Sequence, residues 1–156
     1  MKAGYRADCS GFVEAALQTV DVPWRGSTRD LWAVADAAGA VHRRKEPELG
    51  DLAFFDDTYD RDRNGRTDDE LTHIAIVIDV WPDGTIQLAH DGTSVGRDVL
   101  WMNLHHPDVA IGPAGERWND VLRSSRKRDP KGTKSLSGGL WRGFATVPPN
   151  AVEYPG

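Results

Sequence analysis

Residues Asp8–Val20 read DCSGFVEAALQTV, and the fold of the chain can be inferred outward from this stretch. Apolar side chains recur at helical spacing from Phe12 to Val20, which predicts an amphipathic helix that begins close to Cys9. A helix at this position means that helical structure precedes whatever sheet the rest of the chain forms. The strand candidates must therefore be sought downstream.

The segments that follow predict a second helix and then strands. The Val22-Pro23 pair breaks the first helix, and Ser27 or Thr28 can cap a second one that extends to Gly39. Short runs rich in β-branched and aromatic residues then predict strands at Asp51–Phe55, Ile74–Trp81, Thr85–His90, Val99–Leu104 and Leu140–Val147. This order predicts an α+β fold in which N-terminal helices pack on an antiparallel β-sheet.

Length and composition limit the classes of protein to consider. The chain has 156 residues, 39% hydrophobic and 28% charged, with a formal net charge of −5, which fits one soluble domain spanning 1–156. No apolar run approaches the ~20 residues of a membrane-spanning helix, and the negative charge gives no global support for nucleic-acid binding. The first residues, MKAGYRADCS, lack the apolar stretch of a signal peptide.

The single cysteine, Cys9, raises the question of reactivity. One cysteine excludes an internal disulfide and a zinc site built from several cysteines. At a helix N-terminus, backbone N–H groups and the helix dipole favour the thiolate over the thiol, whereas an inert buried cysteine is the alternative for a lone thiol. The helical register places Cys9 on the apolar face, so a base acting on it should lie on the sheet.

Two histidines are candidates for that sheet. On the predicted strand Ile74–Trp81 and the residue directly before it, His73 and Ala75 share a face. A four-residue turn at Trp81–Gly84 would pair Ala75 with His90, making His90 a diagonal neighbour of His73 within reach of a ring-to-ring hydrogen bond. A two-residue turn would move the pair apart, and a three-residue turn would break it. The remaining histidines are expected on the surface or in loops, with little support for a zinc site: His42, His105 and His106.

Four motifs occur in order along the chain: DCSGFV at Asp8–Val13, LGDLAFF at Leu49–Phe55, THIAIVI at Thr72–Ile78 and LAHDGT at Leu88–Thr93. In order and spacing they resemble the NlpC family of papain-like cysteine peptidases, which are bacterial cell-wall hydrolases. The resemblance implies that Cys9 is the nucleophile, His73 the general base and His90 the residue that orients it. Family members usually carry a tyrosine and a Gly-Gly pair further upstream of the cysteine, whereas here only Tyr5 is available.

The same resemblance implies the substrate and the place of action. We expect cleavage of a peptide amide in peptidoglycan stems, outside the cytoplasm, without a cofactor in catalysis and with no signal sequence in this chain. A remodelling enzyme and an amidase toxin delivered to rival bacteria, with an immunity protein as its partner, would share this chemistry. An acyltransferase on the same scaffold and a non-catalytic wall-binding module are the other classes to consider.

The acidic insertion at about 56–71 resembles a calcium loop in its oxygen donors. Asp60, Asp62, Asn64 and Asp68 occupy the side-chain ligand positions, and the carbonyl of Arg66 occupies position seven. The twelfth position, normally a bidentate Glu, is Leu71, so another carboxylate such as Asp69 or Glu70 would have to close the site. The alternatives are a structural calcium ion and a solvated acidic loop.

A second insertion, at about 112–139, is expected to be a mobile basic loop with a short helix around Trp118–Leu122. Between Arg123 and Lys134 a single acid, Asp129, faces six basic residues: Arg123, Arg126, Lys127, Arg128, Lys131 and Lys134. We interpret this segment as a contact for the acidic wall polymer, the alternative being a solvated loop.

Overall fold

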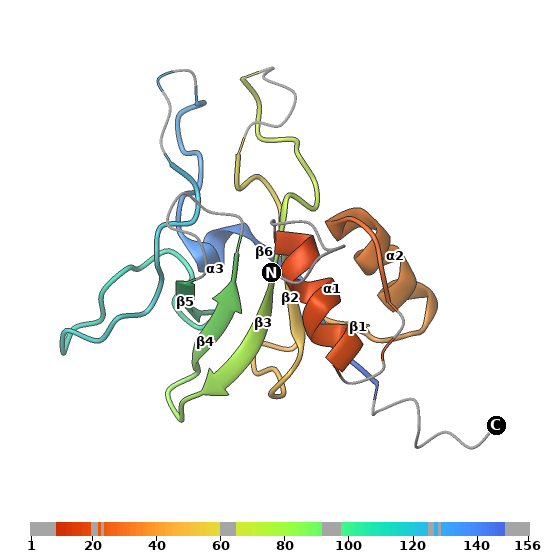
Figure 1. The fold of residues 1–156 in the computed structure, drawn as a ribbon. Coiled ribbons are helices and arrows are strands. Elements are labelled where there is room, and N and C mark those ends of the chain that lie inside the picture. The colour runs from red at the N-terminus through yellow and green to blue at the C-terminus, as the bar shows by residue number, and fades with distance from the viewer. Residues whose placement is uncertain are drawn as a thin grey trace.

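The computed structural model describes residues 9–19, 22, 24–59, 65–91, 98–124, 127 and 129–148, except the side chains of Cys9 and Asp98. They form a six-stranded antiparallel sheet with strand order β1-β6-β2-β3-β4-β5 and helices beside it (Figure 1). This confirms the predicted α+β class. The elements are α1 (Cys9–Thr19), α2 (Thr28–Ala37), β1 (Val41–His42), β2 (Leu52–Phe55), β3 (His73–Val80), β4 (Thr85–His90), β5 (Asp98–Asn103), α3 (Ser137–Leu140) and β6 (Trp141–Ala145).

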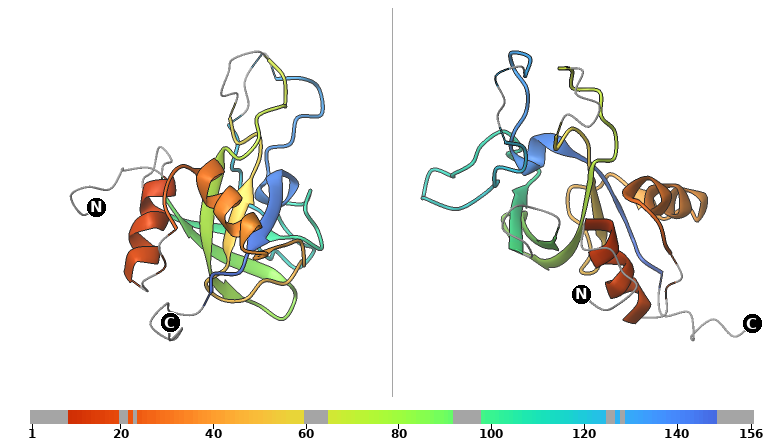
Figure 2. Two further views of the ribbon diagram at one scale, coloured as in Figure 1. Left: turned by 90° about the vertical axis from the view of Figure 1, so that its right-hand side faces the viewer. Right: turned by 45° about the horizontal axis from the view of Figure 1, so that its top comes forward.

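Helices α1 and α2 pack on one face of the sheet (Figure 2). Val13 and Leu17, one turn apart on α1, are buried in the same apolar cluster as Phe54 of β2. Helix α2 starts with a capping box, in which the Ser27 hydroxyl accepts from the Asp30 N–H and the Asp30 carboxylate accepts from the Ser27 N–H. The cap predicted from sequence at Ser27 or Thr28 is therefore Ser27.

The opposite face of the sheet carries a second apolar cluster. Its members come mainly from alternate positions of the strands, together with Leu140, the last residue of α3. They are Ala53, Phe55, Ala75, Val77, Ile86, Leu88, Leu100, Met102, Leu104, Leu140 and Phe144. Because clusters cover both faces, β2 is buried along its whole length, and the apolar run of β3 is nearly continuous instead of alternating.

The β3–β4 hairpin differs from the predicted one at its turn and recovers the predicted pairing further along. The expected four-residue turn would pair Val80 with Thr85. Instead, Val80 pairs with Ile86, and the Trp81 N–H donates to the Thr85 carbonyl, which is the register of a three-residue turn. The register then shifts by one residue between Val77 and Asp79. Beyond this bulge Ile76 pairs with Ala89, as the four-residue turn required.

The segment between β5 and α3 was predicted to contain a helix at Trp118–Leu122, and that prediction is wrong. Asn119 is buried there and organises the chain through hydrogen bonds: its Nδ2 donates to the carbonyls of His106 (2.7 Å) and Val109 (2.9 Å). Its Oδ1 accepts from the Asn103 N–H at 2.9 Å. An extended path fixed by a buried side chain therefore replaces helical hydrogen bonds at this place.

Two loops rise from the edge of the sheet where β2 ends and β3 begins (Figures 1 and 2). One is the acidic loop between β2 and β3, and the other is the basic loop that precedes α3. Arg123 of the basic loop joins them, because its Nη1 donates to the Asp57 carbonyl of the acidic loop at 2.7 Å. Among the residues that the structure describes, no helix has the length and apolar character needed to cross a membrane.

Candidate active site

His73 and His90 lie at the same edge of the sheet. His73 is the first residue of β3 and His90 the last residue of β4, and the two strands are antiparallel neighbours. Continuing the register from the pair Ile76–Ala89 places Ala75 opposite His90, so His90 is the diagonal neighbour of His73. Without the bulge after Val77 the three-residue turn would offset these side chains.

The two imidazole rings are in contact. His73 Nε2 and His90 Nδ1 are 2.9 Å apart, and the rings meet edge to face with centroids 5.1 Å apart. One of these nitrogens must donate and the other accept, because two lone pairs or two protons would repel at this distance. If His73 Nε2 carries the proton, then His73 Nδ1 holds a lone pair that can accept a proton from elsewhere.

Burial keeps His73 neutral. His73 is 6% exposed and His90 4% exposed, and the ring of Phe55 lies 6.0 Å from that of His73. Burial, followed by the neighbouring His90, lowers the pKa of His73 to about 3 from the ordinary value of 6.5. At neutral pH the imidazole is therefore uncharged, which is the form that a general base needs.

Helix α1 lies against the two strands that carry the histidines. It begins at Cys9 and contacts both β3 and β4. The Cys9 side chain, like Tyr5 and Asp8, lies outside the described residues. What the structure establishes is the neighbourhood: a helix N-terminus at Cys9 on a helix packed against the strands of His73 and His90.

A family model supports the same assignment of the chain. The model of the CHAP domain matches residues 1–92, more than half of the chain. The chain belongs to the CHAP domain family. CHAP domains are papain-like amidase and peptidase domains of cell-wall hydrolases, which agrees with the resemblance to NlpC-type enzymes. No curated protein and no solved structure matches the chain. The matched part of the CHAP domain spans Cys9, His73, His90 and the acidic loop.

Two hydrogen bonds between Asp57 and Asp69 close the base of the acidic loop. The N–H of Asp57 donates to the Asp69 carbonyl at 2.7 Å, and the N–H of Asp69 donates to Asp57 Oδ1 at 2.8 Å. Asp69 is buried, and its Oδ2 has no hydrogen-bond partner in the part of the chain that the structure describes. A buried carboxylate oxygen without a hydrogen-bond donor is energetically costly.

The calcium ligands proposed from sequence are only partly placed. Arg66 and Asp68 are exposed, whereas Asp60, Asp62 and Asn64 lie outside the described residues. Within the described ranges, no group of three or more His, Cys, Asp or Glu side chains is arranged to hold a metal.

The histidines outside the pair make separate contacts. His42 is not the surface residue that we expected, because its side chain is 10% exposed and its Nε2 lies 2.8 Å from Asp51 Oδ2. His105 lies 3.6 Å from Glu46, and His106 stacks on Trp118. The three therefore do not converge on one site.

The basic segment is less uniform than its composition indicated. Arg123 is 2% exposed and pairs with Asp129 at 2.6 Å, so it is a structural residue and not a wall contact. Lys134 pairs with Asp108 at 2.9 Å. Lys127 and Lys131 are exposed, while Arg126 and Arg128 lie outside the described residues.

Proposed function

We propose that the protein is a cysteine hydrolase that cleaves peptide amide bonds of peptidoglycan through Cys9, His73 and His90. The observation that carries the proposal is the buried, hydrogen-bonded histidine pair on the strands against which the helix of Cys9 packs. A neutral imidazole is the form that can accept a thiol proton, and a helix N-terminus such as the one at Cys9 favours the thiolate. Membership of the CHAP family supports the amidase or peptidase class.

In the proposed reaction His73 Nδ1 takes the proton of the Cys9 thiol, and the thiolate attacks the amide carbonyl carbon. The C–N bond then breaks, and the leaving amine takes the proton from His73. A thioester remains on Cys9. Water, deprotonated by the same imidazole, attacks the thioester and releases the carboxylate with regeneration of the thiol.

His90 has a positioning role in this proposal. Its Nδ1 lies 2.9 Å from His73 Nε2. In the proposed tautomer His73 Nε2–H donates to it, which would keep the lone pair of His73 on Nδ1 and fix the ring orientation. The tetrahedral oxyanion would be held by the backbone N–H of Cys9 and a neighbouring donor at the helix start. These N–H groups lie at the positive end of the α1 dipole.

Digestion of purified peptidoglycan, followed by mass spectrometry of the fragments, tests the proposed function. Hydrolysis predicts fragments with one new amine and one new carboxylate, which identify the scissile bond. A fragment joined to an added amine would point to an acyltransferase. Binding to sacculi without new termini would point to a wall-binding module and contradict the proposal.

The same chemistry serves a remodelling enzyme or an amidase toxin delivered to rival bacteria. Either would act outside the cytoplasm of its producer, where the substrate is found. A toxin requires an immunity protein that blocks the site in the producing cell. Coexpression of the gene with its neighbours tests this, since a toxin harms its host unless the neighbour is present.

We further propose that the acidic loop binds a structural calcium ion. Asp60, Asp62, Asn64 and Asp68 would supply side-chain oxygens, together with the Arg66 carbonyl. The absence of the usual Glu at position twelve calls for another ligand. Support for Asp69 in this place comes from its buried Oδ2, which lacks a hydrogen-bond partner among the described residues.

A further inference from the structure

The acidic loop returns to the sheet through Leu71, two residues before His73, and Leu71 has an unusual backbone conformation. Its φ is 53°, in the left-handed region that residues with a Cβ atom rarely adopt. Its side chain is 6% exposed and belongs to the apolar cluster of Val13 and Leu17 on α1. Such a conformation persists only where the surrounding contacts hold it.

The contact that holds this turn is a hydrogen bond to the side chain of Asp56. Asp56 Oδ1 accepts from the Leu71 N–H at 2.8 Å. The same carboxylate pairs with Arg142 of β6, whose Nη1 lies 3.2 Å from Oδ1 and 3.4 Å from Oδ2. Arg142 Cζ in turn lies 4.9 Å from the centroid of the Trp32 ring on α2. The position of Asp56 is therefore fixed by contacts with two further elements, β6 and α2.

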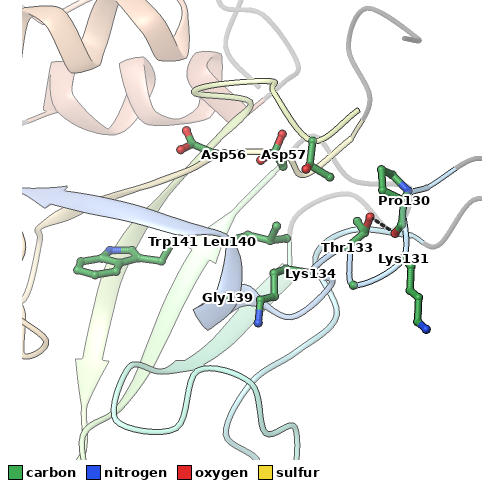
Figure 3. Close-up of a pocket in the computed structure, with 11 residues that line it drawn as sticks. Asp56, Asp57, Pro130, Lys131, Thr133, Lys134, Gly139, Leu140 and Trp141 are labelled. Carbon is green, nitrogen blue, oxygen red and sulfur yellow. Dashed lines mark hydrogen bonds between the residues drawn. The ribbon is translucent and has the colours of Figure 1, made fainter. Parts of the chain in front are cut away.

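Asp56 and its neighbour Asp57 have different partners. Both line a cavity of about 240 Å³ between the acidic and the basic loop (Figure 3). Asp57 forms the two hydrogen bonds with Asp69 at the base of the loop. Asp56 instead bonds the backbone of Leu71, and is therefore the carboxylate through which the loop can act on His73.

Thr72, between Leu71 and His73, is tied to the strand on the other side of the loop. Its N–H donates to the Phe55 carbonyl at 2.9 Å, and its Oγ1 accepts from the Thr58 N–H at 2.9 Å. Phe55 is also the residue that pairs with His73 in the sheet. The hydrogen bonds of Leu71 and Thr72 together set the residue at which β3 begins.

The start of β3 matters because successive side chains of a strand point to opposite faces of the sheet. A shift of one residue at this place would turn His73 away from His90 and break the 2.9 Å contact between their rings. His73 is the first residue of β3. Strand pairing fixes the chain after it, and the turn at Leu71 fixes the chain before it.

We propose that Asp56 is a positioning residue of the active site. By accepting from the Leu71 N–H it holds the left-handed turn that directs His73 toward His90. It acts through the backbone and not by contact with the reacting atoms, and Arg142 holds it in place. The effect on catalysis rests on the proposed function, whereas the effect on the histidine pair can be measured without hydrolysis.

Hydrogen exchange in the Cys9→Ala variant tests the effect on the histidine pair. Heteronuclear NMR follows the Leu71 N–H and the ring N–H that lies between His73 and His90. Adding Asp56→Ala should speed the exchange of both protons by about ten- to hundredfold, the range of a hydrogen bond to a charged group. Asp56→Asn should recover most of the protection, because its amide oxygen can accept from the Leu71 N–H. Asp56 is 31% exposed, so its replacement should leave the core intact.

Asp83→Ala is the matched control. Asp83 Oδ1 accepts from the Thr85 N–H at 2.9 Å, so this variant also removes a carboxylate from a backbone N–H, but at the far end of β3. Exchange of the two protons should stay as in the parent. Arg142→Gln should show the effect of Asp56→Ala in weaker form, because Asp56 then keeps its bond to the Leu71 N–H and loses its ion pair.

Kinetics of the active enzyme test the consequence for catalysis. Asp56→Ala should lower kcat by about ten- to hundredfold and leave KM within about twofold of the parent, because a misplaced base slows the reaction of bound substrate. Asp56→Asn should restore most of kcat. Asp83→Ala should change neither constant.

The outcomes separate this inference from the proposed function. Unchanged exchange of the ring N–H in Asp56→Ala, or equal acceleration in Asp56→Ala and Asp83→Ala, overturns the positioning role while hydrolysis stands. Equal effects of Asp56→Ala and Asp56→Asn overturn the hydrogen bond to Leu71 as its cause. The predicted exchange rates without hydrolysis by the parent support the positioning of the pair and contradict the hydrolase.

Discussion

His73 Nε2 and His90 Nδ1 lie 2.9 Å apart between adjacent strands, in a position where both rings are almost fully shielded from solvent. The contact depends on the register of the hairpin, which a bulge after Val77 restores. It also determines the chemistry available to the pair, since the hydrogen bond fixes one nitrogen of His73 and leaves the other for proton transfer.

Replacing His73 with Ala should lower kcat/KM on peptidoglycan fragments by about 10²–10⁴-fold, the usual contribution of a general base. His90→Ala should cost less, because it removes the partner that orients the base and not the base itself. His90→Asn should retain more activity than His90→Ala, since its amide oxygen can accept from His73 Nε2–H. Steady-state kinetics with the exposed His105→Ala as control measure these effects.

An activity loss in His90→Ala that equals the loss in His73→Ala would contradict this ranking. So would equal activities of His90→Asn and His90→Ala, because the accepted hydrogen bond would then have no effect on catalysis. Circular dichroism of each variant separates a kinetic loss from unfolding.

The depressed pKa of His73 predicts a dependence of stability on pH. Below the unfolded pKa of 6.5 the unfolded chain binds a proton, whereas folded His73 stays neutral until about pH 3. The free energy of unfolding should therefore fall as the pH drops through this window, by about 2 kcal/mol at pH 5 from this residue alone. Urea unfolding of His73→Gln should lack this contribution, and an equal pH dependence in both proteins would contradict it.

Much of the fold could be predicted because its signals are local. The helical spacing around Val13, the cap at Ser27 and the apolar runs of the central strands gave the order of elements and the α+β class. Strand β1, Val41–His42, was missed because two residues show no periodicity and pair only with the distant β6. The prediction of a helix near Trp118 was wrong because the buried Asn119 side chain fixes an extended path there. Its partners are the carbonyls of His106 and Val109, more than one helical turn away in sequence, so local spacing does not reveal them.

The site was predictable in outline only. The positions of His73 and His90 on one face follow from strand alternation, but the turn length was wrong and a compensating bulge cannot be counted from sequence. Arg123 looked like one more surface cation because its burial depends on Asp129 and on the distant Asp57 carbonyl. Asp56 was passed over for the same reason, because its partner, the Leu71 N–H, lies 15 residues further along the chain.

The buried Arg123 predicts a local stability effect. Arg123→Met should leave the Asp129 carboxylate, 10% exposed, without its 2.6 Å partner and should release the Asp57 carbonyl. Breaking one side of a buried pair costs about 3–5 kcal/mol. Lys127→Met, on an exposed side chain of the same loop, should change the free energy of unfolding by less than about 0.5 kcal/mol. Urea unfolding measures the free energy of unfolding of both variants. Equal losses in Arg123→Met and Lys127→Met would contradict the structural role of Arg123.

Calcium should stabilise the protein if the acidic loop binds it. Without a bidentate Glu, we expect a Kd of about 10⁻⁴–10⁻³ M, so about 10 mM calcium should add roughly 1.4–2.7 kcal/mol and raise Tm by several degrees. Magnesium should do less, since it demands a tight octahedral site. Thermal melting with calcium, magnesium and chelator measures the shift.

Variants of the loop test the ligands of this site. Asp62→Ala combined with Asn64→Ala should erase the calcium-dependent shift, and Asp69→Asn should reduce it if Asp69 closes the site. Asp79→Asn, a charge removed from an exposed position on β3, should keep the full shift. A parent melting curve that responds to neither calcium nor chelator would mean that the loop is a solvated insertion.

The most direct test of the account is the release of new amino termini from purified sacculi by the parent enzyme and by Cys9→Ala. Alanine replaces a small side chain at the first position of α1, so the variant should fold. We predict a steady release of amino termini by the parent and none above the uncatalysed background by Cys9→Ala. Release at the parent rate by Cys9→Ala would contradict the central claim that Cys9 is the nucleophile.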